Sequence, residues 1–133
     1  MVRIIHGIGT DIVNIGEIEE IIRKWDRSFI DKVFSEREIE YCEEKVNRFQ
    51  HYAVKFSAKE AFVKALNADI CRGIAWNEIE ILNDPSGKPY VELRGNALEI
   101  SKQKDIKQAF ISVSHENGFG VAMVVLEKNH PLP

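Results

Sequence analysis

The sequence is poor in cysteine, has no long apolar run and carries no excess of basic residues. Its two cysteines, Cys42 and Cys71, lack the partner spacing of a metal site or of a secreted disulfide framework, so we expect both to be reduced thiols. No stretch approaches the roughly 20 apolar residues of a membrane-spanning helix, and residues 1–7 are too short for a signal peptide. These absences predict a cytoplasmic protein that neither spans nor enters a membrane.

The charge and the composition narrow the class further. A net charge of −3 gives no general electrostatic reason to bind nucleic acid, so we expect no such partner. No internal repeat, low-complexity tract or Ser/Gly/Pro linker divides the chain. Its 133 residues are 44% hydrophobic, which is enough for one core without disulfides. We therefore predict a single domain over residues 1–128, followed by a loose C-terminal tail at 129–133.

The first half of the chain predicts one strand and several helices. Residues 2–9 are rich in Ile and Val and lead into Gly7-Ile8-Gly9-Thr10-Asp11, which is typical of a short strand that ends in a tight turn. Over residues 15–25 the apolar positions recur at steps of three and four, which predicts an amphipathic helix. Ser35-Glu36-Arg37-Glu38 has the form of a capping box at the start of a second helix, and residues 48–66 predict the longest one.

The second half predicts strands around one further helix. Residues 76–82 and 90–93 have extended character and flank a turn-rich segment, and residues 96–104 form the helix. Two apolar runs, 109–113 and 120–126, are joined by a segment whose Asn117-Gly118 suits a hairpin turn. The predicted fold class is α+β, with N-terminal helices packed on a mainly antiparallel sheet.

Asp11 has two interpretations. Aspartate is a preferred N-cap residue, so Asp11 could cap the helix that follows the strand. Alternatively, it is a hard oxygen ligand for a cation, and Gly7 and Gly9 let the backbone approach a phosphate closely. The residues alone leave both interpretations open.

The helix over 55–66 and the turn near His115 are equally ambiguous. Glu60 and Lys64 are four residues apart in the favourable order, so an ordinary surface ion pair explains them. However, they share one helical face with Phe56 and Val63, and charges beside apolar contacts are costly unless they are paired or bound to metal. A single histidine in a turn, such as His115, is more often structural than catalytic.

Taken together and in order, these segments resemble the 4′-phosphopantetheinyl transferase superfamily, and within it the short bacterial type, the holo-acyl-carrier-protein synthases. The resemblance spans nearly the whole chain. The matching pieces are Gly7-Ile8-Gly9-Thr10-Asp11-Ile12-Val13, Phe34-Ser35-Glu36-Arg37-Glu38, the 55–66 run with its central Ala58-Lys59-Glu60-Ala61, Gly87-Lys88-Pro89, and Ser112-Val113-Ser114-His115.

The resemblance implies a Mg²⁺-dependent transferase of fatty acid biosynthesis. Such an enzyme moves the 4′-phosphopantetheine group from coenzyme A to a serine of apo acyl carrier protein and releases adenosine 3′,5′-bisphosphate. It also implies a homotrimer with active sites between subunits. Carrier proteins are acidic, so the basic cluster Arg23, Lys24 and Arg27 would suit this partner, although Glu17 and Glu20 make the same helix acidic.

The resemblance also assigns roles to single residues. Asp11 and Glu60 match the two Mg²⁺ carboxylates, and Mg²⁺ usually takes one or two carboxylates with water and substrate phosphate. Glu60 is our hypothesis for the group that takes the serine proton. Lys64 counts with these two as catalytic and also contacts the coenzyme phosphates. The positions assigned to coenzyme A are Lys55, Lys59, Lys64, Pro89 and His115.

Two departures and two rival interpretations remain. Lys55 stands where arginine is frequent, so a single point charge would replace a bidentate phosphate contact, and Glu116 follows His115 where a hydroxyl residue is common. A non-catalytic module that binds a carrier protein or a nucleotide would keep the fold without the reaction. A structural oligomeric protein would leave the two carboxylates on separate surfaces.

Overall fold

The computed structural model describes residues 1–132, and over these residues the α+β fold class is confirmed. The elements in chain order are β1 (Val2–Asn14), α1 (Ile15–Trp25), α2 (Arg27–Val33), α3 (Glu36–Glu43), α4 (Arg48–Leu66), the short 3₁₀ helices η1 (Ala68–Cys71) and η2 (Trp76–Glu78), β2 (Ile79–Asn83), β3 (Pro89–Leu93), α5 (Gly95–Gln103), β4 (Ile106–Glu116) and β5 (Phe119–His130).

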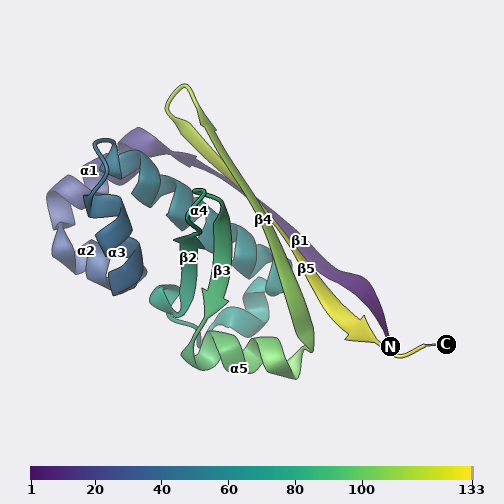
Figure 1. Cartoon of the computed structure of the whole chain (residues 1–133). Coiled ribbons are helices and arrows are strands. Elements are labelled where there is room, and N and C mark those ends of the chain that lie inside the picture. Colours follow the sequence, from purple (N-terminus) through teal and green to yellow (C-terminus); the bar gives the residue numbers. More distant parts are fainter. Residues whose placement is uncertain (133) are drawn as a thin grey trace.

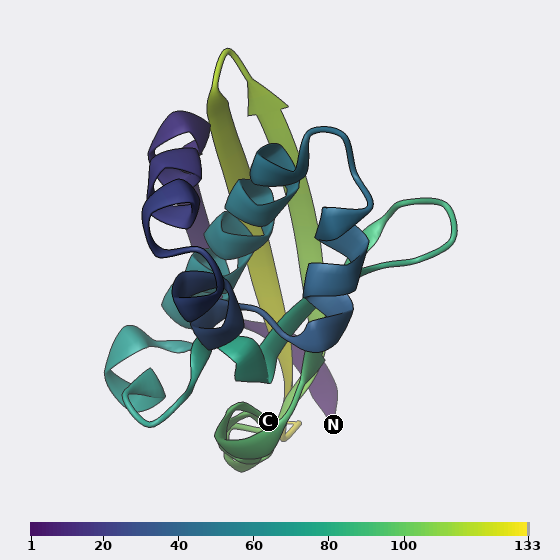
Figure 2. The ribbon, with the colours of Figure 1, turned by 90° about the vertical axis from the view of Figure 1, so that its left-hand side faces the viewer.

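The structure is built as layers around α4. β1, β5 and β4 form an antiparallel sheet in that order, and β2 pairs with β3 in a second, two-stranded sheet. The helices and the small sheet all lie on one side of the long strands (Figure 1). Seen from that side, α4 crosses in front of the sheet and the shorter helices surround it (Figure 2). The sheet therefore has one covered face and one open face.

The first strand is longer than the sequence predicts. β1 continues to Asn14, so the glycine motif makes no turn, and Asp11 lies inside the strand opposite Ala122 of β5. A Cβ added to Gly9 would lie only 1.9 Å from the carbonyl oxygen of Ala61, and one added to Gly7 meets α4 in the same way. The glycines thus let β1 lie directly against α4, which is a structural reason for their presence; the close approach of a phosphate stays a prediction.

The helix boundaries follow the local sequence signals closely. α1 spans the predicted residues, but its N-cap is Asn14, whose side chain accepts from the N–H of Glu17, so Asp11 is not the cap. The Ser35 capping box at the start of α3 is confirmed. No local signal predicts α2, which follows Asp26, a residue in the left-handed region with φ of 45°.

The strands of the second half also extend beyond their predicted limits. The Asn117-Gly118 turn is confirmed, with both residues at positive φ. His115 lies within β4, paired with Gly120, and not in the turn. β5 continues through Asn129 and His130, which pair with β1, so these two residues do not belong to the predicted tail; residue 133 lies outside the described residues.

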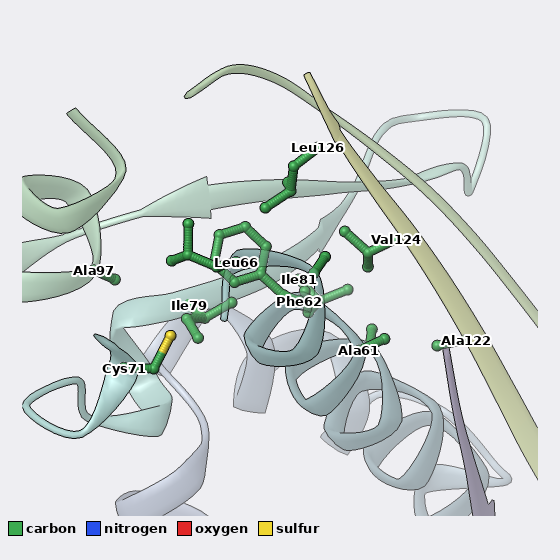
Figure 3. Packing of buried hydrophobic residues seen from close by; sticks show 12 residues of the cluster. Ala61, Phe62, Leu66, Cys71, Ile79, Ile81, Ala97, Ala122, Val124 and Leu126 are labelled. Atoms are coloured by element: carbon green, nitrogen blue, oxygen red, sulfur yellow. The ribbon is translucent and has the colours of Figure 1, made fainter. Parts of the chain in front are cut away.

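Two hydrophobic clusters fill the space on either side of α4. One contains Phe62 and Leu66 together with β2 and the covered face of β5 (Figure 3). The other contains Tyr52 and packs against α1, α2 and α3. Because α4 is buried on two opposite sides, it is fixed in place by both clusters. No helix over residues 1–132 is long and apolar enough to cross a membrane.

Candidate active site

The close contact between β1 and α4 brings Asp11 beside the acidic and basic residues of the helix. The hydroxyl of Ser57 on α4 lies 3.0 Å from Oδ2 of Asp11 and 3.1 Å from its main-chain carbonyl oxygen. Nζ of Lys64, two turns further along α4, donates to the carbonyl oxygen of Thr10 at 3.0 Å and to Oδ1 of Asp11 at 3.3 Å. Both oxygens of the Asp11 carboxylate therefore face α4.

Glu60 completes this group. Partial burial, a hydrogen bond that the protonated Glu60 donates to the neighbouring Asp11 carboxylate and the negative charge of Asp11 together raise the pKa of Glu60 to about 7, while the ammonium of Lys64 opposes the shift. Two carboxyl groups in contact repel each other when both are charged, and partial burial between β1 and α4 strengthens this repulsion. Lys64 bonds to Asp11 in this arrangement, so the simple surface pair between Glu60 and Lys64 is not what the structure contains.

Asp11 and Glu60 fit a hard divalent cation. Over residues 1–132 no group of three or more acidic, His or Cys side chains could hold a metal by itself. Mg²⁺ needs no such group, because it commonly takes one or two carboxylates and completes its octahedron with water and substrate phosphate. A pair of touching carboxyl groups with a raised pKa is also the electrostatic situation that a cation relieves.

A second group of predicted residues lies around a small cavity between α4, the β2–β3 pair and β4. Lys55, Pro89 and His115 line this cavity of about 150 Å³. Nε2 of His115 lies 3.2 Å from the side-chain amide nitrogen of Gln50. None of Asp11, Glu60 and Lys64 lines the cavity.

Lys55 is not the free point charge that the sequence suggested. Only 4% of the residue is exposed. Its Nζ donates to the carbonyl oxygen of Ile81 and, at 2.7 Å, to Oδ1 of Asn83, and it lies 4.6 Å from the centre of the Tyr41 ring. Burial lowers its pKa. Lys55 therefore holds the end of β2 in place through hydrogen bonds to Ile81 and Asn83, and it lines the cavity at the same time.

The prediction that Lys59 contacts coenzyme A is contradicted by its position. Lys59 is fully buried, and its Nζ donates to the carboxylate of Glu38 at 2.7 Å and to the carbonyl oxygens of Trp76 and Ile79. All three ammonium hydrogens are thus used inside the protein. Successive helical residues point about 100° apart, so neighbourhood to Glu60 in sequence did not place Lys59 in the same site.

The two groups of predicted residues lie at opposite edges of the main sheet. Asp11 belongs to edge strand β1 and His115 to edge strand β4, with β5 between them. Adjacent strands are about 4.8 Å apart, which separates the two edge strands by about 10 Å before any side chain is added. Within one chain the carboxylate group and the cavity around His115 are separate features.

Comparison with known proteins assigns this arrangement to a family. The sequence matches the 4′-phosphopantetheinyl transferase superfamily over residues 7–123. The chain belongs to this superfamily. The holo-[acyl-carrier-protein] synthase of Syntrophus aciditrophicus is 46% identical over 123 residues, which cover 92% of this chain and 96% of that protein.

Solved structures agree with this membership. The holo-[acyl-carrier-protein] synthase of Neisseria meningitidis superposes with a TM-score of 0.85 at 32% identity, covering 94% of this chain and 100% of the other. That of Helicobacter pylori, in complex with coenzyme A, gives a TM-score of 0.78 at 32% identity and covers 90% and 98%.

The sequence did not predict the residues that hold the predicted site residues of this phosphopantetheinyl transferase superfamily member in place. Ser57 bonds Asp11, Gln50 bonds His115, and Asn83 bonds Lys55. Ser57 had a usable signal, because it lies three residues before Glu60 and so shares part of the same helical face. Gln50 and Asn83 act across tertiary contacts and had none.

Proposed function

We propose that this chain is a holo-[acyl-carrier-protein] synthase that serves fatty acid biosynthesis. The serine hydroxyl of apo acyl carrier protein attacks the phosphorus that carries the pantetheine arm of coenzyme A. The bond to the other phosphate of the diphosphate breaks, and adenosine 3′,5′-bisphosphate leaves. The observation that carries the proposal is the meeting of Asp11, Glu60 and Lys64, remote in sequence, in a chain that is 46% identical to a relative of that name.

In this proposal Asp11 and Glu60 hold Mg²⁺, which when bound would offset the negative charge of the diphosphate and of the leaving phosphate. The proximity of the two carboxyl groups supports the assignment. Lys64 has a side chain that is 54% exposed and a long 3.3 Å contact to Asp11. Its ammonium can therefore turn from Asp11 to a substrate phosphate without breaking a buried network.

We assign the serine proton to Glu60, acting through a metal-bound water. The pKa of about 7 holds for the metal-free chain; a bound cation would favour the charged form of Glu60, which is the form that accepts a proton. In this role the residue is charged before the reaction and carries the proton afterwards. Glu60→Gln keeps the shape of the side chain but cannot take the proton; unchanged kinetics across pH at full Mg²⁺ occupancy would exclude the assignment.

The decisive experiment incubates the full chain with coenzyme A, Mg²⁺ and apo carrier protein, and weighs the carrier by mass spectrometry. We expect the phosphopantetheine adduct with the wild type and its near-complete loss in Asp11→Ala and Glu60→Ala. Glu99→Ala is the matched control, because Glu99 is an exposed carboxylate on α5, remote from the site. If a folded wild type modifies none of several carriers, the chain is a binding module instead.

We also propose a homotrimer with active sites between subunits. The open face of the main sheet is apolar, although its side chains are exposed: the large ones, 41 to 66% exposed, are Ile8, Ile12, Phe110, Val121 and Met123. Contiguous apolar surface of this kind marks an interaction site. The placement of the two groups of site residues at opposite sheet edges gives independent support, because the β1 edge of one subunit could face the β4 edge of the next.

Two measurements test the assembly. Met123→Glu should lower the mass measured by analytical ultracentrifugation from trimer to monomer, whereas Val46→Glu, on a fully exposed loop valine, should leave it unchanged. Mixing the inactive Asp11→Ala chain with an inactive His115→Ala chain should restore part of the activity, because some interfaces then combine an intact carboxylate edge with an intact histidine edge. Mixed trimers without any recovered activity would argue that each chain carries its own site.

The basic residues around the junction of α1 and α2 are our proposed contact for the acidic carrier. Arg23 and Arg27 are each tied to an acidic residue one turn away, Glu19 and Asp31. Lys24 lies over the ring of Trp25. The acidic partners of the two arginines thus weaken the positive field at this surface, and carrier binding should depend more on Lys24 than on either arginine.

A cytoplasmic location is also part of the proposed function, and two buried free thiols suit that reducing compartment.

A further inference from the structure

The hydroxyl of Ser57 lies directly behind the carboxylate of Asp11, in the seam between β1 and α4. The residue is fully buried. Its single hydroxyl hydrogen faces two acceptors on Asp11, Oδ2 at 3.0 Å and the main-chain carbonyl oxygen at 3.1 Å. A charged carboxylate is the stronger acceptor of the two, so the hydrogen bond to Oδ2 dominates while Asp11 is ionised.

This contact divides the two carboxylate oxygens of Asp11 between different neighbours. Oδ2 is engaged by Ser57 on the buried side and Oδ1 has the long contact with the exposed Lys64, while the carboxyl group of Glu60 lies against the same carboxylate. The terminal torsion of an aspartate side chain is broad and has no strong preference of its own. One buried donor on one oxygen therefore sets the plane of the whole carboxyl group.

We propose that Ser57 is a positioning residue that holds Asp11 so that Oδ1 is presented to the divalent cation. The inference rests on the proposed function, since it concerns the residue that we assign as a metal ligand. Ser57 touches neither the cation nor the substrate and acts only through Asp11. Outer partners of this kind orient metal ligands, and their removal typically lowers metal affinity by about 10- to 100-fold.

Ser57→Ala is a clean perturbation of this contact. It removes one oxygen atom from a helix interior, where alanine has the higher helix propensity. A purely structural role, tying β1 to α4 through the carbonyl oxygen of Asp11, would appear as lost stability. A positioning role would appear as lost metal affinity at unchanged stability.

The experiment titrates the full-length wild type and its variants with Mn²⁺ alone, followed by electron paramagnetic resonance, and records a thermal melt of each. We expect the Kd for Mn²⁺ to rise about tenfold in Ser57→Ala without a lower Tm. Ser57→Thr keeps the hydroxyl and should bind within about threefold of the wild type. Ser35→Ala, which loses a buried hydroxyl that bonds Glu80, should show the reverse pattern, with a lower Tm and an unchanged Kd.

A second readout comes from the transfer reaction. In Ser57→Ala the Mg²⁺ concentration that gives half the maximal rate should rise by a similar factor, and kcat at saturating Mg²⁺ should stay within about twofold. Rotational freedom of the Asp11 carboxylate lowers the affinity for Mg²⁺, and a saturating Mg²⁺ concentration compensates for the lower affinity.

The outcomes separate this inference from the function on which it rests. If Ser57→Ala binds Mn²⁺ as tightly as the wild type while Asp11→Ala does not bind it, the positioning role is wrong and the metal assignment stands. A folded Ser57→Thr that binds as poorly as Ser57→Ala would also overturn the role of the hydroxyl. If the wild type binds no Mn²⁺, the assignment of Asp11 as a metal ligand and the positioning role fail together, while the transfer assay still tests the reaction.

Discussion

Replacing Gly9 by alanine tests whether the contact between β1 and α4 builds the site. The added Cβ would lie 1.9 Å from the carbonyl oxygen of Ala61 and 2.8 Å from the main-chain nitrogen of Ala65. Both are backbone atoms of a helix packed on two sides, so neither can yield as a flexible side chain would. The strand must withdraw by about 1.5 Å to bring the 1.9 Å approach to an ordinary contact distance, and overpacking of this kind costs about 1–3 kcal/mol and occasionally more.

We expect Gly9→Ala to lower the free energy of unfolding by about 3 kcal/mol, at the upper end of that range, because the obstacle is rigid on both atoms. The same withdrawal carries Asp11, two residues further along β1, away from Ser57 and Glu60. Transfer to carrier protein should therefore fall steeply even at temperatures where the variant is still folded.

Urea denaturation followed by circular dichroism, and the mass-spectrometric transfer assay, measure the two effects. Gly73→Ala is the matched control, since a Cβ there meets nothing within 4 Å and φ is not positive. That substitution should change stability by less than about 1 kcal/mol. If Gly9→Ala were as stable and as active as Gly73→Ala, the close approach of strand and helix would have no role in forming the site.

Three further substitutions test individual charges. The pKa of Glu60 is raised from 4.5 to about 7, so between these pH values the metal-free folded chain binds more protons than the unfolded chain. The free energy of unfolding should therefore fall as the pH rises through this window. Thermal melts of Glu60→Gln should show no such pH dependence. Lys59→Met should lower the free energy of unfolding, measured by urea denaturation, by about 3–5 kcal/mol, because it leaves Glu38 charged and buried without its partner. Combining Lys59→Met with Glu38→Gln should recover part of that loss. Lys64→Ala should raise the KM for coenzyme A severalfold at nearly unchanged stability; a normal KM would contradict its phosphate contact.

Local patterns in the sequence predicted those elements whose ends carry their own signals. α1 and α4 have the predicted bounds, and the Ser35 capping box opens α3 where expected. α2 went unnoticed because it has only seven residues and no side-chain cap at Asp26. β1 was cut short because Gly7 and Gly9 are typical of a turn, and only the neighbouring helix explains them as part of a strand.

The candidate site was predictable in its residue types but not in its arrangement. Resemblance placed Asp11, Glu60 and Lys64 in one group, and the structure brings them together. It could not show that Lys59 points into the core, because adjacent helical residues face different ways. Nor could it show that His115 lies on the far edge strand, because strand order depends on contacts between distant segments.

The buried ion pair between Lys59 and Glu38 has a further consequence for how this protein can vary. With its ammonium held at three points, Lys59 fixes the rotation of α4 about its own axis, and that rotation decides where the next residue, Glu60, projects. Adding or deleting one residue between Lys59 and the start of the helix would leave this local order intact but would shift every earlier contact by about 100°. Changes of length are therefore incompatible with the body of α4 before Lys59.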